Sequence, residues 1–252
     1  MKLLLKLSYL GTSFCGYQVQ KDKRTVQGEL NSATKALFGC DCDVTGCSRT
    51  DSGVHANMFC CTVSEKGKNS LSTALPAERI PRALTAHLPP DIAVYCAEWV
   101  DDEFHARYDV KYKEYIYRIC NSAVRDPFTN GRAWYVAQRL TDKDVKLMNE
   151  AAQHFIGEHD FSAFMAQGSK VQSTVRTVKY ASVEKCGEEI IFTVAADGFL
   201  YNMVRIMTGT LIAVAQGKIS PDNIPNIIES HDRSLVGMTA PAEGLYLNHV
   251  EY

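Results

Sequence analysis

Apolar residues occupy every second position from Leu3 to Tyr9, and Lys6 and Ser8 stand among the positions between them. This alternation predicts a strand with one mainly apolar face. Similar patterns predict extended segments at Asp43–Cys47, Asn57–Ser64, Asp91–Val100, Tyr112–Asn121 and Leu245–Glu251. We expect Val175–Lys185 and Glu189–Ala196 to form a hairpin that turns near Gly187.

In other segments, apolar residues recur at helical spacing and predict helices. Apolar residues recur from Val26 to Leu37 after Thr25, whose hydroxyl suits an N-cap, and Gly39 can end this helix. A second long helix is expected after Thr141, because Asp144 completes a capping pattern there. Its apolar positions share one face. Further helices are predicted at Pro81–His87, Leu200–Gln216 and Asp222–Ser230.

The order of these elements indicates the fold class. Strands and helices are mixed without the strict alternation of a doubly wound fold. The pattern therefore predicts an α+β architecture, in which helices cover an antiparallel or mixed sheet. A chain of 252 residues is long enough for one large domain or two closely packed halves.

The composition and the apolar runs argue against a signal peptide and a membrane span. Hydrophobic residues make up 46% and charged residues 22%, as in ordinary globular proteins. Lys6 interrupts the opening apolar run too early for a signal peptide. The most apolar window, Phe199–Gly217, contains Arg205, which favours a buried helix over a membrane span. We therefore expect a cytoplasmic protein without a membrane partner.

The chain contains nine cysteines, an odd number that cannot pair completely. This favours reduced thiols over a secreted disulfide scaffold. Cys40, Cys42 and Cys47, with His55 shortly after them, raise the question of zinc. Their spacing lacks the paired C-x-x-C halves typical of a structural zinc site, so we expect no metal.

The net charge of −2 gives no global indication of nucleic acid, but an RNA-binding surface needs positive charge only locally. Between Phe104 and Arg139, seven Lys and Arg residues against three acids leave a balance of +4, and six Tyr and Trp residues are interleaved. Cations for phosphates and flat rings for bases suit flipped or single-stranded nucleotides. A solvated, tyrosine-rich pair of strands would have the same composition.

The segment from Gly46 to Ala56 lies between two expected strands, so we expect a loop, where scaffolds usually carry catalytic groups. Asp51 lies there among small residues, which allow a ligand to approach closely. Arg49, two residues earlier, can guide a phosphate or hold a displaced base. A catalytic Asp51 is one interpretation; a cap, a turn, or half of a metal site with His55 are the others.

Arg205 lies in the apolar helix and needs an anion, because a buried guanidinium keeps its charge. Candidate partners are Asp51, Asp160 and Asp197. A guanidinium beside a catalytic carboxylate would keep that carboxylate ionised, as a nucleophile must be. A structural ion pair, or an arginine that extends out of the helix to water, are the alternatives.

Several segments, taken in order, resemble the tRNA pseudouridine synthase A family over nearly the whole chain. They are Tyr9–Gln18, Thr25–Gly28, Arg49–Ala56, Leu88–Ile92, Phe104–Tyr108, Lys113–Tyr117, Gly157–Phe161, Phe199–Arg205 and Ala240–Leu247. The departures from the family's pattern are small: Leu10 replaces an acid, Tyr17 a tryptophan, and Cys47 and Ser48 smaller residues.

The resemblance implies two related α+β halves, ferredoxin-like or RRM-like, that flank a basic active-site cleft. In this sequence the halves are residues 1–105, which carry the catalytic loop, and residues 106–252. Family members resemble one another in forming homodimers that hold tRNA, so tRNA and a second copy of the chain are the implied partners.

The resemblance also implies roles for single residues. The catalytic aspartate falls on Asp51, and the tyrosine that stacks on or bounds the target base falls on Tyr115. Arg205 matches the arginine that pairs with the aspartate, and Leu245 the leucine beneath the base. Arg49 matches the arginine that handles the extruded nucleotide.

A stretch associated with tRNA contact falls on Phe104, His105, Ala106, Arg107 and Tyr108. Residues 168–176 match a second such stretch more loosely.

The implied reaction converts uridine to pseudouridine in the anticodon stem-loop, around positions 38 to 40 of the tRNA. It involves no redox change and no net hydrolysis, so no cofactor is expected. Asp51 would attack the base or the sugar, or would assist a glycal intermediate. A paralogous synthase with another uridine target, a non-catalytic tRNA-binding module, and a zinc hydrolase that uses Asp51 and His55 are the competing hypotheses.

Overall fold

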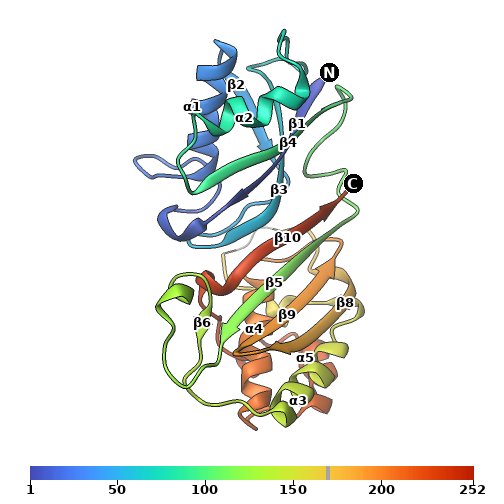
Figure 1. The fold of residues 1–252 in the computed structure, drawn as a ribbon. Helices are drawn as coiled ribbons and strands as arrows, with labels where there is room; N and C mark the ends of the chain where they lie inside the picture. The colour runs from blue at the N-terminus through green and yellow to red at the C-terminus, as the bar shows by residue number, and fades with distance from the viewer. Residues whose placement is uncertain (169–170) are drawn as a thin grey trace. The chain divides into compact units, whose positions relative to one another are not determined.

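The computed structural model describes residues 1–168 and 171–252. Strands and helices are mixed and most strand pairings are antiparallel, so the predicted α+β class is confirmed. The chain forms two compact units: unit 1 comprises residues 1–111 and 246–252, and unit 2 comprises residues 112–245 (Figure 1). The predicted halves, 1–105 and 106–252, stay a prediction.

The sheet of unit 1 is built around β3 (His55–Glu65). β1 (Lys2–Tyr9) lies antiparallel between β3 and β4 (Ile92–Val100). The other edge of β3 pairs with two strands, antiparallel with β2 (Cys42–Gly46) and parallel with β10 (Leu245–Glu251). The C-terminal strand therefore returns to the sheet that begins at the N-terminus.

Helices α1 (Val26–Phe38) and α2 (Ile80–Thr85) cover one face of this sheet (Figure 1). The Thr25 hydroxyl accepts a hydrogen bond from Gly28 N, and Gly39 ends α1 with a φ of 71°, as predicted for the two ends. Leu3, Leu5, Leu7, Val26 and Leu30 are fully buried. The apolar alternation of β1 therefore identifies the core face.

In unit 2, β5 (Tyr112–Cys120), β9 (Glu189–Ala196), β8 (Val175–Cys186) and β7 (Gly157–Asp160) follow one another as antiparallel neighbours. β6 (Trp134–Tyr135) adds a short parallel pairing to β5. The predicted hairpin of β8 and β9 is confirmed, and Gly187 supplies its left-handed turn residue with a φ of 63°. β6 and β7 are too short to be recognised from periodicity.

Unit 2 also contains α3 (Asp142–Gln153), α4 (Met203–Ala215) and α5 (Ile224–Ser230). The capping box at Thr141 and Asp144 is confirmed. The α4 prediction began too early, at Leu200, because Asn202 adopts a left-handed conformation, with a φ of 60°, and α4 starts only after it. None of the helices formed by residues 1–168 and 171–252 is long and apolar enough to cross a membrane.

Short 3-10 turns connect these elements. They are Gly11–Ser13, Ala77–Arg79, Pro127–Thr129, Ser162–Phe164, Pro221–Asn223, Arg233–Leu235 and Ala242–Gly244. The predicted helix at Asp222–Ser230 therefore begins with such a turn, and its α-helical part starts only at Ile224.

All nine cysteines are free thiols. Cys60 and Cys61 on β3 and Cys47, directly after β2, are completely buried in unit 1, and Cys60 N donates a hydrogen bond to Cys47 Sγ at 3.4 Å. Burial raises the pKa of Cys60 to about 12 and that of Cys61 well above its usual range. These two thiols therefore stay protonated at neutral pH and act as small apolar core residues.

Two buried tyrosines differ in how their hydroxyl groups are satisfied. The ring of Tyr17 stacks on Phe59 at 4.4 Å, but its buried hydroxyl has no hydrogen-bond partner within the part of the chain that the structure describes. The hydroxyl of Tyr117 donates to the carbonyl oxygen of Pro241 at 2.6 Å. Leaving a buried polar group without a partner costs free energy, whereas a buried hydrogen bond is favourable.

The two Tyr→Phe substitutions are therefore expected to have opposite signs. Tyr17→Phe should raise the free energy of unfolding by about 1 kcal/mol, because it removes an unsatisfied hydroxyl. Tyr117→Phe should lower it by about 1 kcal/mol, because it leaves the Pro241 carbonyl without its donor. Urea unfolding followed by circular dichroism measures both. Destabilisation by Tyr17→Phe as large as that by Tyr117→Phe would contradict this account.

Candidate active site

The loop that carries Asp51 is anchored to the segment between β1 and α1. The hydroxyls of Tyr9 and Thr50 are hydrogen-bonded at 2.7 Å in a buried position, and Tyr17 N donates to Thr50 O at 3.1 Å. On the other side of Asp51, the Ser52 hydroxyl donates to Phe14 O at 3.1 Å. Asp51 itself is half-buried. The residues on both sides of this carboxylate are thus fixed by long-range contacts.

Two glycines permit this close approach. A Cβ on Gly11 would overlap the carbonyl group of Val54, and a Cβ on Gly16 would lie 2.8 Å from Thr50 O. Gly16 also has a φ of 85°, a conformation that side chains disfavour. Gly11 N donates to Nδ1 of the buried His55 at 2.9 Å. The backbone of the 11–16 segment therefore packs directly on the loop.

This geometry bears on the alternative of a metal site. The His55 ring accepts the Gly11 hydrogen bond and stacks on Tyr246 at 4.5 Å, so it holds the loop in place. Cys47 Sγ accepts a hydrogen bond from Cys60 N. Across residues 1–168 and 171–252, no group of three or more His, Cys, Asp and Glu side chains is arranged to hold a metal ion. His55 is thus a buried structural residue, and Arg49 is exposed at the loop surface.

The segment Phe104–Tyr108 also lies in unit 1 and is folded by its own polar groups. His105 Nδ1 accepts hydrogen bonds from Arg107 N at 3.1 Å and Tyr108 N at 3.3 Å. Ala106 is buried, and its carbonyl accepts from the Tyr252 hydroxyl at 2.7 Å. Tyr108 is 74% exposed, and the Arg107 guanidinium lies 5.9 Å from its ring centroid. The segment therefore presents a cation and a flat ring to solvent.

Arg205 is half-buried near the start of α4 in unit 2. Its Nε donates to Ala240 O at 2.7 Å, and one terminal nitrogen donates to Asn202 Oδ1 at 2.7 Å. Ala240 N in turn donates to Arg205 O at 3.1 Å. The guanidinium thus ties the left-handed residue before α4 to the chain near Ala240, which explains why an arginine stands in this apolar helix.

Two of the aspartates considered as partners for Arg205 have other roles within unit 2. Asp160 accepts a hydrogen bond from Ser162 N at 2.9 Å, and Asp197 accepts one from Thr177 N at 3.1 Å. The Asp160 carboxylate therefore stabilises a local turn, and the Asp197 carboxylate ties its segment to β8.

Tyr115 and Leu245 are both buried in unit 2, at 6% exposure each. The Tyr115 ring meets Phe199 edge-on, with centroids 5.0 Å apart. Leu245 follows the 3-10 turn Ala242–Gly244, which Tyr117 holds through its hydrogen bond to Pro241. Burial raises the pKa of Tyr117 far above its usual range, although the charge of Arg205 acts in the opposite direction. Tyr117 therefore serves as a neutral hydrogen-bond donor.

Two arginines of the basic segment predicted between Phe104 and Arg139 form ion pairs within the protein. Arg118 forms a two-point ion pair with Glu189, at 2.9 and 2.6 Å, and Arg139 pairs with Glu188 at 2.7 Å. Both acids lie outside that segment, so these two arginines are structural. Of the second stretch considered for tRNA contact, 168–176, residues 169–170 lie outside the described part of the chain.

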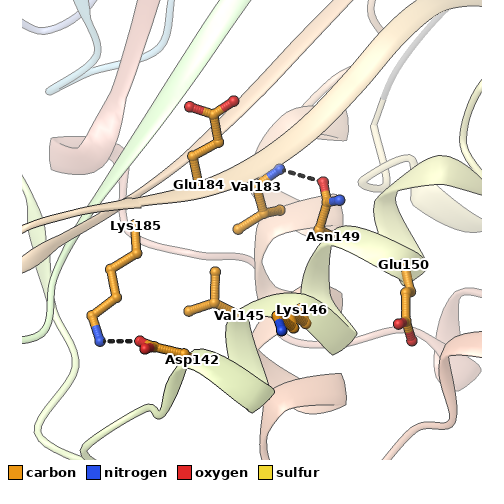
Figure 2. Close-up of a pocket in the computed structure, with 8 residues that line it drawn as sticks. All are labelled: Asp142, Val145, Lys146, Asn149, Glu150, Val183, Glu184 and Lys185. Atoms are coloured by element: carbon orange, nitrogen blue, oxygen red, sulfur yellow. Dashed lines mark hydrogen bonds and ion pairs between the residues drawn. The ribbon is translucent and has the colours of Figure 1, made fainter.

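A pocket of about 490 Å³ lies between α3 and β8 and contains none of the predicted site residues (Figure 2). Lys185 bridges to Asp142 at 2.6 Å, and Val183 N donates to Asn149 Oδ1 at 2.9 Å (Figure 2). These polar groups therefore tie the helix to the strand, and we assign no chemistry to this pocket.

Sequence reasoning missed the groups that support the site. Tyr9 and Thr50 were not singled out, although a hydroxyl directly before Asp51 and another at the end of the first strand were visible. Tyr117 was counted among the interleaved aromatic residues, but its anchoring role was not predicted, although it shares the buried face of β5 with Tyr115, two positions away. Spacing alone could not reveal their long-range partners.

The comparisons with known proteins agree with the family resemblance. A family model described as tRNA pseudouridine synthase matches residues 7–109 and 151–252. The tRNA pseudouridine synthase A of Acetivibrio thermocellus is 44% identical over 248 residues, which cover 98% of each chain. Those of Thermoanaerobacter sp. strain X514 and Clostridium acetobutylicum are 42% and 41% identical, over 99% and 98% of each chain. The chain therefore belongs to the tRNA pseudouridine synthase family of isomerases.

Proposed function

We propose that the protein isomerises uridine to pseudouridine in tRNA and that its target lies in the anticodon stem-loop, around positions 38 to 40. The observation that carries the proposal is the anchored Asp51 loop, in a chain that belongs to this family. A carboxylate on a loop held from both sides suits a reaction that needs one precisely placed acidic group, because preorganisation lowers the cost of reaching the reactive geometry.

Asp51 is the proposed catalytic carboxylate. It would attack the base or the sugar of the flipped uridine, or would assist the glycal route in which a proton leaves C2′. In each case the N1–C1′ bond breaks, the uracil turns, and a C5–C1′ bond forms, so atoms and electrons balance without a cofactor. Flipping costs a few kcal/mol of unstacking. Stacking on an aromatic ring, for which Tyr115 is proposed, offsets part of that cost.

The remaining roles follow the family pattern. Arg49, exposed beside the loop, is proposed to handle the extruded nucleotide, and Leu245 to pack beneath the base. Arg205 is proposed to hold the catalytic aspartate ionised. The segment Phe104–Tyr108 is proposed to contact tRNA, supported by its exposed Tyr108 ring and the neighbouring Arg107. We further propose a cytoplasmic homodimer.

Asp51→Asn should abolish turnover without weakening tRNA binding much, because the amide keeps the shape of the side chain but cannot act as the charged nucleophile. The measurement is tritium release from tRNA transcripts labelled at uridine C5, with the modified positions mapped. We expect a fall in kcat of at least about a thousandfold and a change in the tRNA dissociation constant of less than about threefold.

Asp22→Asn is the matched control, because Asp22 is an exposed aspartate of the same unit in a left-handed conformation that asparagine also adopts. It should turn over like the wild type. Release by Asp51→Asn at the wild-type rate would exclude Asp51 as the catalytic group. Modification away from positions 38 to 40 would favour a paralogous synthase, and tight binding without release by the wild type would favour a binding module.

Arg205→Lys should reduce kcat by at least about tenfold, because lysine lacks the planar fork that reaches Ala240 O and Asn202 Oδ1 together. Arg233→Lys is the structural control. Arg233 donates to Gly237 O at 3.0 Å and to the Thr239 hydroxyl at 3.2 Å, so it ties down the same stretch of chain. The proposed role of Arg205 is wrong if both variants lose stability and activity equally.

A further inference from the structure

A second polar pocket, of about 440 Å³, lies entirely within unit 1 and includes neither Asp51 nor Arg49. β1, β2 and β3 supply part of its wall, together with α1 and the segment that contains Phe104. Six of the thirteen residues that line it carry a hydroxyl or an amide: Gln27, Asn31, Thr45, Thr62, Ser64 and Asn69. Uncharged hydrogen-bonding groups are thus the largest class of side chain at this surface.

Two of these hydroxyls belong to residues that are otherwise largely buried. Thr62 is 5% exposed and Ser64 is 8% exposed, and both line the pocket. Asn31, which also lines the pocket, has a buried side-chain oxygen without a hydrogen-bond partner among residues 1–168 and 171–252. Because a buried polar atom without a partner is unfavourable, the pocket favours a ligand that brings its own donors and acceptors.

The strand register places these groups in one row. Thr62 and Ser64 are two positions apart on β3, so their side chains lie on the same face of the sheet. Their cross-strand partners on β2 are Thr45 and Asp43. Three hydroxyls and one carboxylate therefore lie side by side, at the spacing of neighbouring strand positions.

The charged groups at the pocket already have partners. Lys2 Nζ donates to Phe104 O at 3.1 Å, and Lys68 pairs with Glu65 at 2.6 Å. Asp43 accepts a hydrogen bond from Gly67 N at 2.8 Å. A ligand whose main feature is a phosphate would therefore find few available cations. A sugar, whose hydroxyls both donate and accept, matches the pocket better.

We propose that this pocket binds a ribose of the RNA substrate, at a nucleotide other than the reacting uridine. The proposal rests on the proposed function for the identity of the RNA. Thr62 and Ser64 hydrogen-bond to the ribose hydroxyls, and the Phe104 ring at the pocket covers the apolar side of the sugar. Because the 2′-hydroxyl distinguishes RNA from DNA, the pocket contributes to that selectivity.

The test compares wild type with the double variant Thr62→Val, Ser64→Ala, which removes both hydroxyls with little change in volume. Two measurements are made: KM and kcat for tritium release from tRNA, and the dissociation constants for an RNA stem-loop and its DNA counterpart. We expect KM and the RNA dissociation constant to rise about fivefold to tenfold, with kcat within about twofold. The ratio of DNA to RNA dissociation constants should fall, because RNA binding alone is weakened.

Two controls separate this effect from general damage. Thr62→Ser keeps the hydroxyl and should bind RNA like the wild type. Ser182→Ala, Thr193→Val removes a directly paired serine and threonine from the sheet of unit 2 and should leave both constants unchanged. Thermal unfolding confirms that each variant is folded.

Unchanged KM and an unchanged DNA-to-RNA ratio in the folded double variant would overturn the proposal. So would an equal effect of the control pair. Failure of the proposed function has a different signature, the absence of tritium release by the wild type, and the ratio of dissociation constants still tests the pocket in that case.

Discussion

The packing of the 9–17 segment against the Asp51 loop is the constraint on which unit 1 depends. The loop runs between two strands of one sheet, and it is also held by Tyr9 at the end of β1 and by Gly11 and Gly16 in the segment that follows. Direct contact between two backbones leaves no room for side chains, so the constraint requires glycine at two positions. Backbone contacts therefore hold the residues on both sides of Asp51.

In unit 2, side-chain hydrogen bonds to backbone carbonyls hold the corresponding segment. Here Arg205 donates a hydrogen bond to the backbone carbonyl of Ala240, and Tyr117 donates one to the backbone carbonyl of Pro241. Both carbonyls lie directly before the turn that leads to Leu245. Charged and polar groups inside an apolar unit would be costly without partners, and each of these has one. Arg205 also fixes the left-handed Asn202 before α4. One polar cluster thus sets both the start of a helix and the position of a predicted base-contacting residue.

The sequence predicted the strongly periodic elements well, because a buried face leaves a direct trace in the residue pattern. β1, α1, α3 and the β8–β9 hairpin all belong to this class. Periodicity carries no information on which strands become neighbours, so it could not show that β10 returns to pair in parallel with β3. For the same reason, a short motif predicts a role for Asp51 but does not reveal the contact between its neighbours Tyr9 and Thr50, which lie 41 residues apart in the sequence.

The most direct test of this account is single-turnover tritium release by Gly11→Ala, performed on protein that circular dichroism shows to be folded. A methyl group at this position overlaps the Val54 carbonyl and must displace the Asp51 loop. We expect release to slow by at least about a hundredfold, as for a small misplacement of a catalytic group, while tRNA binding changes little. Release at the wild-type rate would show that the contact does not position the carboxylate and would contradict the account.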